Sequence, residues 1–146
     1  MKIFISGTAG FGRQTMTKLP DNVIEFLHDI MKNNYDILIG DCQGVDTLVQ
    51  KILSENNYKN VTVYCSGSKC RNIIDTSWKT KNIFVPKGTT GRAFFAVKDN
   101  AMAKDADCAL AIWDGKSQGT GTNIRNMRDR NKPVTIYRTD LNIFES

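Results

Sequence analysis

Between residues 113 and 123 the chain carries a run of small and polar residues, WDGKSQGTGTN, directly after an apolar segment. Its three glycines let backbone N–H groups approach a phosphate closely, and its serine and threonines add hydroxyl donors. Asp114 closes the apolar segment, and the Trp113 ring offers a surface for stacking a base. The segment is either an anion-binding turn or a glycine-rich turn without a ligand. The candidate ligand contacts are Trp113, Asp114, Gly115, Ser117, Gly119, Thr120 and Asn123.

A second candidate site follows the apolar residues 37–39, in the sequence GDCQGVD. This segment opens an amphipathic helix, whose first N–H groups and positive dipole end attract anions. Asp41 either caps the helix or accepts a hydrogen bond from a ribose hydroxyl. Asp46 lies in the first turn, where a carboxylate either stabilises the helix or contacts a ligand. We count Asp41, Gly44 and Asp46 as candidate ligand contacts.

Two further segments give weaker signals. Residues 6–13, SGTAGFGR, have neither the glycine spacing of a dinucleotide fingerprint nor that of a P-loop. They form either a phosphate contact or a flexible loop, and the candidate contacts are Ser6, Gly7, Thr8 and Arg13. Lys98 shares a helix face with Met102, four residues on, so it either reaches an anion over the strand ends or stays exposed beside a core methionine.

Positive charge is concentrated in the middle of the chain. Residues 69–98 hold seven Lys or Arg and one Asp, a net charge of +6, whereas the whole 146-residue chain carries +5. Such a segment either suits an anionic ligand or nucleic acid, or is a solvated surface. Arg71 and Asn72 are the candidate ligand contacts within it. Its aromatic residues are either stacking platforms for bases or part of the core, and they are Trp78, Phe84, Phe94 and Phe95.

Segments typical of strands and helices alternate along the chain, which predicts right-handed βαβ units and a parallel sheet. We expect strands at 2–6, 36–40, 61–65, 107–113 and 133–137. We expect helices at 21–33, 45–53, 92–106 and 122–131. The prediction is one Rossmann-like α/β domain over residues 1–146, with about five strands, helices on both faces and a ligand at the carboxyl ends of the strands. Residues 66–91 are too long for a routine connection, so we expect them to be functional or ordered by a ligand.

Cysteine usage and hydropathy limit the class of protein. The four cysteines form no CxxC pair, and the only histidine, His28, is far from them in sequence, so we expect no metal and no other cofactor. We expect all four to be small buried thiols in a reducing compartment. No apolar run approaches the roughly 20 residues of a membrane span, so we expect a cytoplasmic protein without a membrane partner.

Taken together, three motifs resemble those of the SLOG superfamily. They are Gly40-Asp41-x-x-Gly44-Val45-Asp46 after a strand, Lys98-Asp99-x-x-Met102 before Ala106-Asp107, and Asp114-Gly115-x-x-x-Gly119-Thr120. The resemblance covers about residues 2–137 and is greatest to small single-domain bacterial and phage members. This Rossmann-like group includes the cytokinin-activating phosphoribohydrolases and DNA-processing protein A. The resemblance implies a nucleotide or nucleotide-derived ligand lying across the strand ends.

The chain departs from the phosphoribohydrolases at their catalytic positions. Lys98 stands where that family has the arginine of its RKxxM motif, and Thr122 and Asn123 stand where glutamates follow PGGxGT. Neither Thr122 nor Asn123 can stabilise an oxocarbenium-like centre as a carboxylate does. Related deoxyribosyltransferases also need a glutamate that is missing here. An enzyme would need another carboxylate, and position alone favours Asp99 or Asp114 as base or nucleophile.

Three functions follow, ranked in this order. The first is binding of a nucleotide or ribosyl-phosphate ligand, as a sensor or sequestering protein. The second is N-glycosidic hydrolysis of a nucleoside monophosphate or related ribosyl compound. The third is binding of single-stranded nucleic acid. A thin apolar face on the last helix, Ile124 and Met127, also allows self-association as a homo-oligomer.

Overall fold

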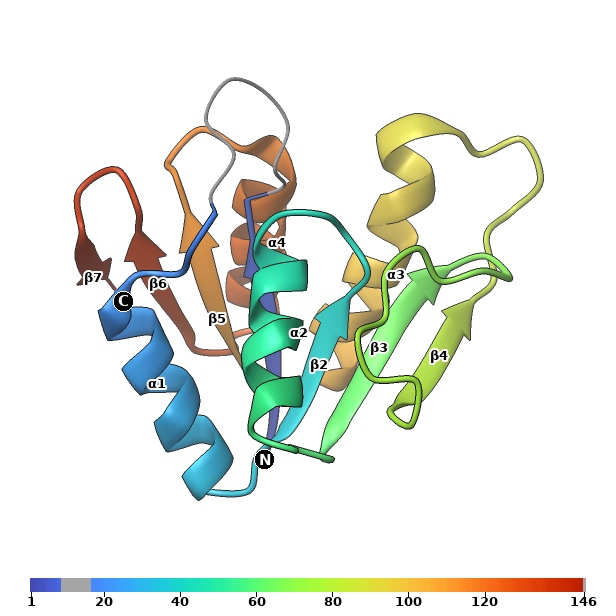
Figure 1. Ribbon diagram of the computed structural model, residues 1–146. Helices are drawn as coiled ribbons and strands as arrows, with labels where there is room; N and C mark the ends of the chain where they lie inside the picture. The colour runs from blue at the N-terminus through green and yellow to red at the C-terminus, as the bar shows by residue number, and fades with distance from the viewer. Residues whose placement is uncertain (9–16, 146) are drawn as a thin grey trace.

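The computed structural model describes residues 1–8 and 17–145, and the candidate contact Arg13 lies outside them. The described chain forms a seven-stranded sheet with helices on both faces (Figure 1). The strands are β1 (Lys2–Gly7), β2 (Asp36–Gly40), β3 (Val61–Ser66), β4 (Lys79–Ile83), β5 (Cys108–Trp113), β6 (Val134–Arg138) and β7 (Ile143–Glu145). The helices are α1 (Asp21–Lys32), α2 (Val45–Glu55), α3 (Gly91–Asp105) and α4 (Gln118–Asp129).

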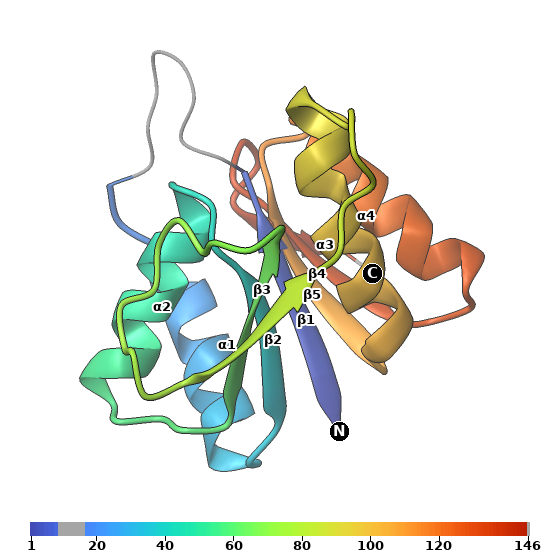
Figure 2. The same ribbon diagram turned by 90° about the vertical axis from the view of Figure 1, so that its right-hand side faces the viewer.

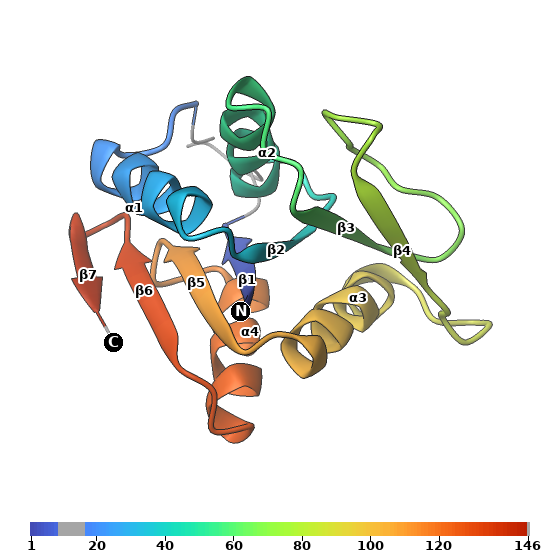
Figure 3. The same cartoon turned by 90° about the horizontal axis from the view of Figure 1, so that it is seen from below.

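The strand order is β4-β3-β2-β1-β5-β6-β7, with β1 to β6 parallel and β7 antiparallel to β6. Helices α1 and α2 cover one face, and α3 and α4 cover the other (Figures 2 and 3). The sheet grows from β1 outward to β4, and the chain then returns to add β5 on the other side of β1. Open α/β sheets bind ligands where the direction of growth reverses, which is here beside β1 at the carboxyl ends of the strands.

The central strands are buried on both faces, which explains their nearly continuous apolar sequences. On one face Ile5 packs in a cluster with Leu27 of α1 and Val49 of α2. On the other face Phe4 packs in a cluster with Met102 of α3 and Met127 of α4. Successive residues of β1 therefore serve two separate cores, and α3 and α4 are held against the face that α1 and α2 do not cover.

The expected α/β class and parallel sheet are confirmed, but the sheet has two more strands than expected. Strand β4 reads KTKNI and is largely exposed at the sheet edge, so it carries no apolar alternation that a sequence reading can detect. Strand β7 has only three residues and follows a tight turn in which Asn142 adopts a φ of 55°. Both additions are edge strands, where burial imposes little pattern on the sequence.

Helix α4 begins at Gln118, four residues before the expected start at residue 122. The glycines of this segment have low helix propensity, which hides the first turn in the sequence. The two residues on which the prediction of self-association rests, Ile124 and Met127, are buried against the sheet. They are therefore not available to a second copy of the chain, and self-association stays a prediction.

The expectation that all four cysteines are buried thiols is wrong. Cys65, the penultimate residue of β3, and Cys70 form a disulfide, whereas Cys42 and Cys108 are free and half-buried. The two cysteines are five residues apart, and the chain turns sharply after β3, where Gly67 has a φ of 78°. No helix in the described part of the chain is long and apolar enough to cross a membrane.

Substitution of Gly7 by Ala should destabilise the fold. A Cβ at Gly7 would lie 2.2 Å from Cγ1 of Val45, a fully buried side chain in the first turn of α2. Overpacking of this kind lowers the free energy of unfolding by about 1–3 kcal/mol, which urea unfolding measures. Gly119→Ala is the matched control, because its Cβ meets nothing within 4 Å, and it should leave stability unchanged or raise it slightly. Equal stability of the two variants would contradict the tight contact between β1 and α2.

Candidate functional site

A cavity of about 530 Å3 lies at the carboxyl ends of β1 and β2, between these strands and the helices α3 and α4. The strand arrows of β1 to β6 point toward this edge, where α2, α3 and α4 begin (Figure 1). The volume falls within the range of small-molecule and cofactor sites. Ten predicted ligand or catalytic residues line it, and they are Ser6, Gly7, Asp46, Arg71, Lys98, Asp99, Ser117, Gly119, Thr120 and Asn123.

The floor of the cavity is a chain of polar side chains from three elements. Lys98 is 3% exposed, and its Nζ lies 2.8 Å from Oδ1 of Asp99. Asn123 of α4 donates from Nδ2 to Oγ of Ser6 at 2.8 Å and to Oδ2 of Asp99 at 3.4 Å. The hydrogen bonds therefore join α3, α4 and the end of β1. Asp99 stays partly accessible, with its side chain 21% exposed.

Asp46 forms the second carboxylate beneath the cavity. Its Oδ2 accepts a hydrogen bond from the backbone N–H of Cys42 at 3.1 Å. Burial raises the pKa of Asp46 to about 7, although the nearby Lys98 ammonium acts in the opposite direction. Burial lowers the pKa of Lys98, but Asp99 and Asp46 outweigh it and raise that pKa above its usual value. The floor thus holds two carboxylates and one firmly protonated amine.

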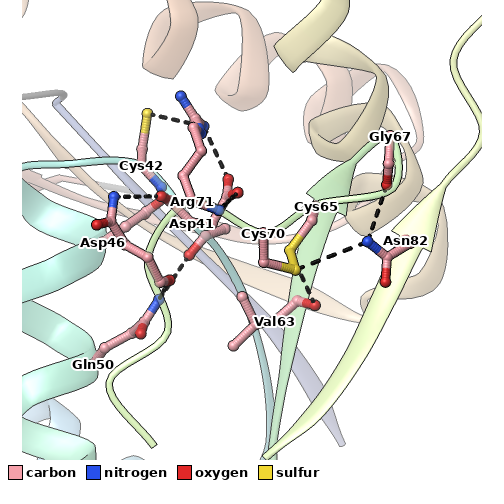
Figure 4. The surroundings of a disulfide bond; sticks show 12 residues. Asp41, Cys42, Asp46, Gln50, Val63, Cys65, Gly67, Cys70, Arg71 and Asn82 are labelled. Atoms are coloured by element: carbon pink, nitrogen blue, oxygen red, sulfur yellow. Dashed lines mark hydrogen bonds and ion pairs between the residues drawn. A yellow bond between two sulfur atoms is a disulfide. The ribbon is translucent and has the colours of Figure 1, made fainter. Parts of the chain in front are cut away.

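Arg71 reaches the cavity from the segment that follows β3. Its Nη2 donates to Oδ1 of the buried Asp41 at 2.9 Å, and its backbone N–H donates to Oδ2 of the same carboxylate at 2.7 Å (Figure 4). The guanidinium carbon lies 3.9 Å from the ring centre of Phe95 on α3. Side-chain hydrogen bonding to Asp41 raises the pKa of Arg71 despite its partial burial. This cation therefore has a fixed position at the cavity wall.

The mouth of the cavity is formed by the first turns of α3 and α4. Arg92, in the first turn of α3, donates from Nη1 to Oε1 of Gln118, the first residue of α4. The N–H groups of the first helical turn lack partners within the helix, and Gly119 and Thr120, which belong to this turn of α4, line the cavity. An anion at this position would meet a helix N-terminus and an arginine.

Seven predicted contacts lie outside the cavity lining. They are Thr8, Asp41, Gly44, Asn72, Trp113, Asp114 and Gly115. Oδ1 of Asp114 accepts hydrogen bonds from the backbone N–H groups of Lys116 and Ser117 at 2.9 and 2.8 Å, so it shapes the turn before α4. These hydrogen bonds keep the pKa of Asp114 below its usual value although burial raises it.

The other residues of this group also have structural contacts. Trp113 Nε1 donates to the carbonyl of Ser117 at 2.9 Å, and Thr8 Oγ1 accepts from the N–H of Asp114 at 3.3 Å. Gly44 precedes α2 with a φ of 85°, and Asn72 Nδ2 donates to the Asp41 carbonyl at 2.9 Å. They support the residues that line the cavity.

Several lining residues were not among the predicted ligand contacts, chiefly Cys42, Arg92 and Gln118. Arg92 and Gln118 lie in first helical turns at the carboxyl edge of the sheet, and the correct helix starts would have identified them. Phe95, which the sequence left as either a stacking platform or a core residue, also lines the cavity. Among the described residues, no group of three or more His, Cys, Asp and Glu is arranged to hold a metal ion.

Asp46→Asn should flatten the dependence of stability on pH. The pKa of Asp46 is about 7 in the folded protein against an ordinary value of 3.8, so between these values the folded state binds the extra proton. The contribution of this group to stability is therefore full below about pH 4 and is lost as the pH rises through 7. Asparagine keeps an acceptor for the N–H of Cys42 and has no proton to lose.

The measurement is urea unfolding of wild type and variant at about pH 4.5 and about pH 8. Glu55→Gln, which removes an exposed carboxylate at the end of α2, is the control and should retain the wild-type difference between the two pH values. If the free energy of unfolding falls by the same amount in wild type and Asp46→Asn on going to high pH, the pKa of Asp46 is not raised in the folded protein.

Comparison with protein-family models and with the sequences of curated proteins finds no match. Solved structures do match. The structural genomics target TM1055 has a TM-score of 0.66 and 22% identity, over 91% of this chain and 71% of its own. DNA processing protein A from Helicobacter pylori, studied for its single-stranded DNA binding mode, has a TM-score of 0.68 and 19% identity. The match covers 93% of this chain, which spans 64% of that protein.

A third match is the molybdenum cofactor binding protein from the phototrophic bacterium Rippkaea orientalis, with a TM-score of 0.68 and 16% identity, over 96% of this chain and 77% of its own. At these identities the likeness concerns the fold. All three proteins have Rossmann-like folds of the SLOG type. The described chain therefore has the Rossmann-like fold of these three proteins, the fold class expected from its sequence.

Proposed function

We propose that the protein binds a nucleotide or nucleotide-derived ligand in this cavity, as a sensor or sequestering protein. The observation that carries the proposal is the cavity of about 530 Å3 in which the first turn of α4 and two arginines, Arg71 and Arg92, face a floor of hydrogen-bonding side chains. The phosphate lies at the first turn of α4, next to Arg92. The sugar and base extend toward the floor.

The positive charge at the mouth of the cavity favours binding of a phosphate there. Arg92 contacts a neutral partner, Gln118, so its charge is not neutralised there. The N-terminal turn of α4 adds the positive end of a helix dipole and free N–H groups. Charge-assisted hydrogen bonds of this kind are the strong ones in anion recognition.

The side chains of the cavity floor favour binding of a hydroxyl-bearing group such as ribose. Asp99 accepts hydrogen bonds and remains partly accessible, and Asn123 and Ser6 have hydrogen-bonding groups on the same wall. One of the proteins with this fold is named for molybdenum cofactor binding, and one was studied for binding single-stranded DNA. Ligand binding thus recurs among the proteins with this fold, and a nucleotide is our proposal for the ligand of this chain.

The basic middle segment gives less support to nucleic-acid binding. Trp78 is buried in the core, and Phe94 and Phe95 are half-buried and pack edge to face with ring centres 5.1 Å apart. Phe84, at 82% exposure, is the fully accessible aromatic residue of the four. Stacking along a strand needs a series of exposed rings, so we rank this function below binding of a mononucleotide.

Binding should depend on Arg92. Calorimetric titration with adenosine and guanosine 5′-monophosphates should show binding that the nucleosides without phosphate lack. Arg92→Ala should weaken binding about tenfold, which corresponds to the loss of one charge-assisted hydrogen bond. Arg130→Ala removes the same charge from an exposed site at the end of α4 and should leave the affinity unchanged.

Two results would overturn this proposal. One is equal affinity for nucleoside and nucleotide, which would mean that the phosphate contributes nothing to binding. The other is no binding of either nucleotide together with salt-sensitive binding of a short single-stranded oligonucleotide, since several phosphate contacts give a steep salt dependence. The second result would make the basic segment the functional surface.

A second candidate function is N-glycosidic hydrolysis, which the position of Asp99 favours. This carboxylate lines the cavity, and its two oxygens lie 2.8 Å from Lys98 Nζ and 3.4 Å from Asn123 Nδ2. Such contacts orient it toward a ligand on the floor, as a base or nucleophile must be. Asp114 lies outside the lining and is the weaker candidate.

If chromatography of the titration mixture shows release of the base, Asp99→Asn should slow the release about 100-fold or more. Asp114→Asn is the matched control, because asparagine also accepts hydrogen bonds from backbone N–H groups and should keep the turn. Unchanged release in Asp99→Asn would exclude this residue as the catalytic carboxylate.

A further inference from the structure

The disulfide lies directly before the arginine of the cavity wall. Cys65 belongs to β3 and is fully buried, and Cys70 is half-buried and precedes Arg71 (Figure 4). The bond closes a short ring through residues 66–69, of which Ser68 and Lys69 are exposed. It therefore fixes the start of the segment that carries Arg71 to the carboxyl end of β3.

The segment after the disulfide is held by buried polar groups. Arg71 binds Asp41 through both its backbone N–H and its guanidinium. Gln50 of α2 is fully buried, and its Nε2 donates to the carbonyls of Gly40 and Asn72 at 3.0 and 3.1 Å. Its Oε1 accepts from the N–H of Ile74 at 2.9 Å. Residues 71–74 thus lie close to the end of β2 and to the middle of α2.

The ring itself also has a contact with the edge strand. Asn82 of β4 donates from Nδ2 to the carbonyl of Gly67 at 3.0 Å, and the same amide lies 4.0 Å from Sγ of Cys70. Gly67 donates from its N–H to the carbonyl of Ile83 at 2.9 Å. The covalent bond is the strongest of these links, and without it Cys70 is joined to β3 through residues 66–69 alone, two of which are exposed.

We infer that the Cys65–Cys70 disulfide positions Arg71 in the cavity wall, so that reduction of this disulfide weakens the binding of a phosphate-bearing ligand. The inference rests on the proposed function, because it assigns redox control to the same cavity. In the oxidised protein the guanidinium is held between Asp41 and the Phe95 ring. In the reduced protein the segment gains freedom, and ligand binding must include the cost of ordering Arg71 again.

The chemistry needs a dithiol as reductant. A thiolate of the dithiol attacks Sγ of Cys70, the more accessible sulfur, and forms a mixed disulfide while Cys65 leaves as a thiolate and takes a proton. The second thiol of the reductant then closes its own disulfide and releases Cys70 as a thiol. Two protein thiols form, and the dithiol is oxidised to a cyclic disulfide.

The first step of the test counts thiols. Alkylation of the denatured protein followed by mass measurement should label Cys42 and Cys108 in the oxidised protein and all four cysteines after dithiothreitol treatment. The affinity for adenosine 5′-monophosphate is then measured in both states. We expect about tenfold weaker binding by the reduced protein, comparable to loss of one charge-assisted contact.

Variants separate this effect from a general loosening of the fold. The double variant Cys65→Ala/Cys70→Ala should bind as the reduced wild type does and should not respond to dithiothreitol. Cys108→Ala, which removes a free thiol at the amino end of β5, is the control and should retain the full response. Arg71→Ala should bind weakly in both states, because the group on which the disulfide acts is gone.

Hydrogen exchange gives a readout that does not depend on the ligand. The N–H of Arg71 is bonded to Asp41, and its exchange should accelerate about tenfold on reduction. If adenosine 5′-monophosphate binds in neither state, the proposed ligand is wrong, and acceleration of this exchange still supports the positioning of Arg71. Three results overturn the inference: four labelled cysteines in the oxidised protein, unchanged exchange on reduction, or a wild-type response to dithiothreitol in Arg71→Ala.

Discussion

The buried ammonium of Lys98 determines the arrangement at the carboxyl edge of the sheet. At 3% exposure it needs counter-charges, and it has Asp99 at 2.8 Å and Asp46 close by. Gly40 makes the approach possible, since a Cβ there would lie 3.3 Å from Lys98 Nζ and 2.8 Å from Asp46 Oδ2. The end of β2, the first turn of α2 and the middle of α3 are therefore fixed around one charge.

A second buried charge pair extends this arrangement outward. Asp41 follows β2 directly, is 1% exposed, and is neutralised by Arg71 from a segment thirty residues further along the chain. Removing Arg71 would leave the buried Asp41 carboxylate without its counter-charge. The pair therefore fastens the segment after β3 to the end of β2. Together the two charged groups, Lys98 and Arg71, define two sides of the cavity, and the helix starts of α3 and α4 define its mouth.

Much of this arrangement was predictable from sequence, and the failures have physical causes. Apolar runs and helix-period patterns located the buried strands and the helices, and the rule that ligands lie at strand ends located the cavity. Ser6, Asp46, Lys98 and Asn123 were predicted from separate segments and line one cavity. The edge strands β4 and β7 and the disulfide were missed, because exposed residues carry little pattern and cysteine spacing does not reveal a sharp turn.

The cavity has opposite polarity at its two ends, which restricts the ligands it accepts. Its floor has two carboxyl groups, Asp46 and Asp99, for one ammonium, and burial raises the pKa of Asp46 to about 7, so that this group carries part of a negative charge at neutral pH. Its mouth has Arg92 and the first turn of α4. A ligand with phosphates at both ends would place a negative charge against Asp99 and lose binding energy. A ligand with one phosphate and a hydroxyl-bearing opposite end meets favourable partners throughout.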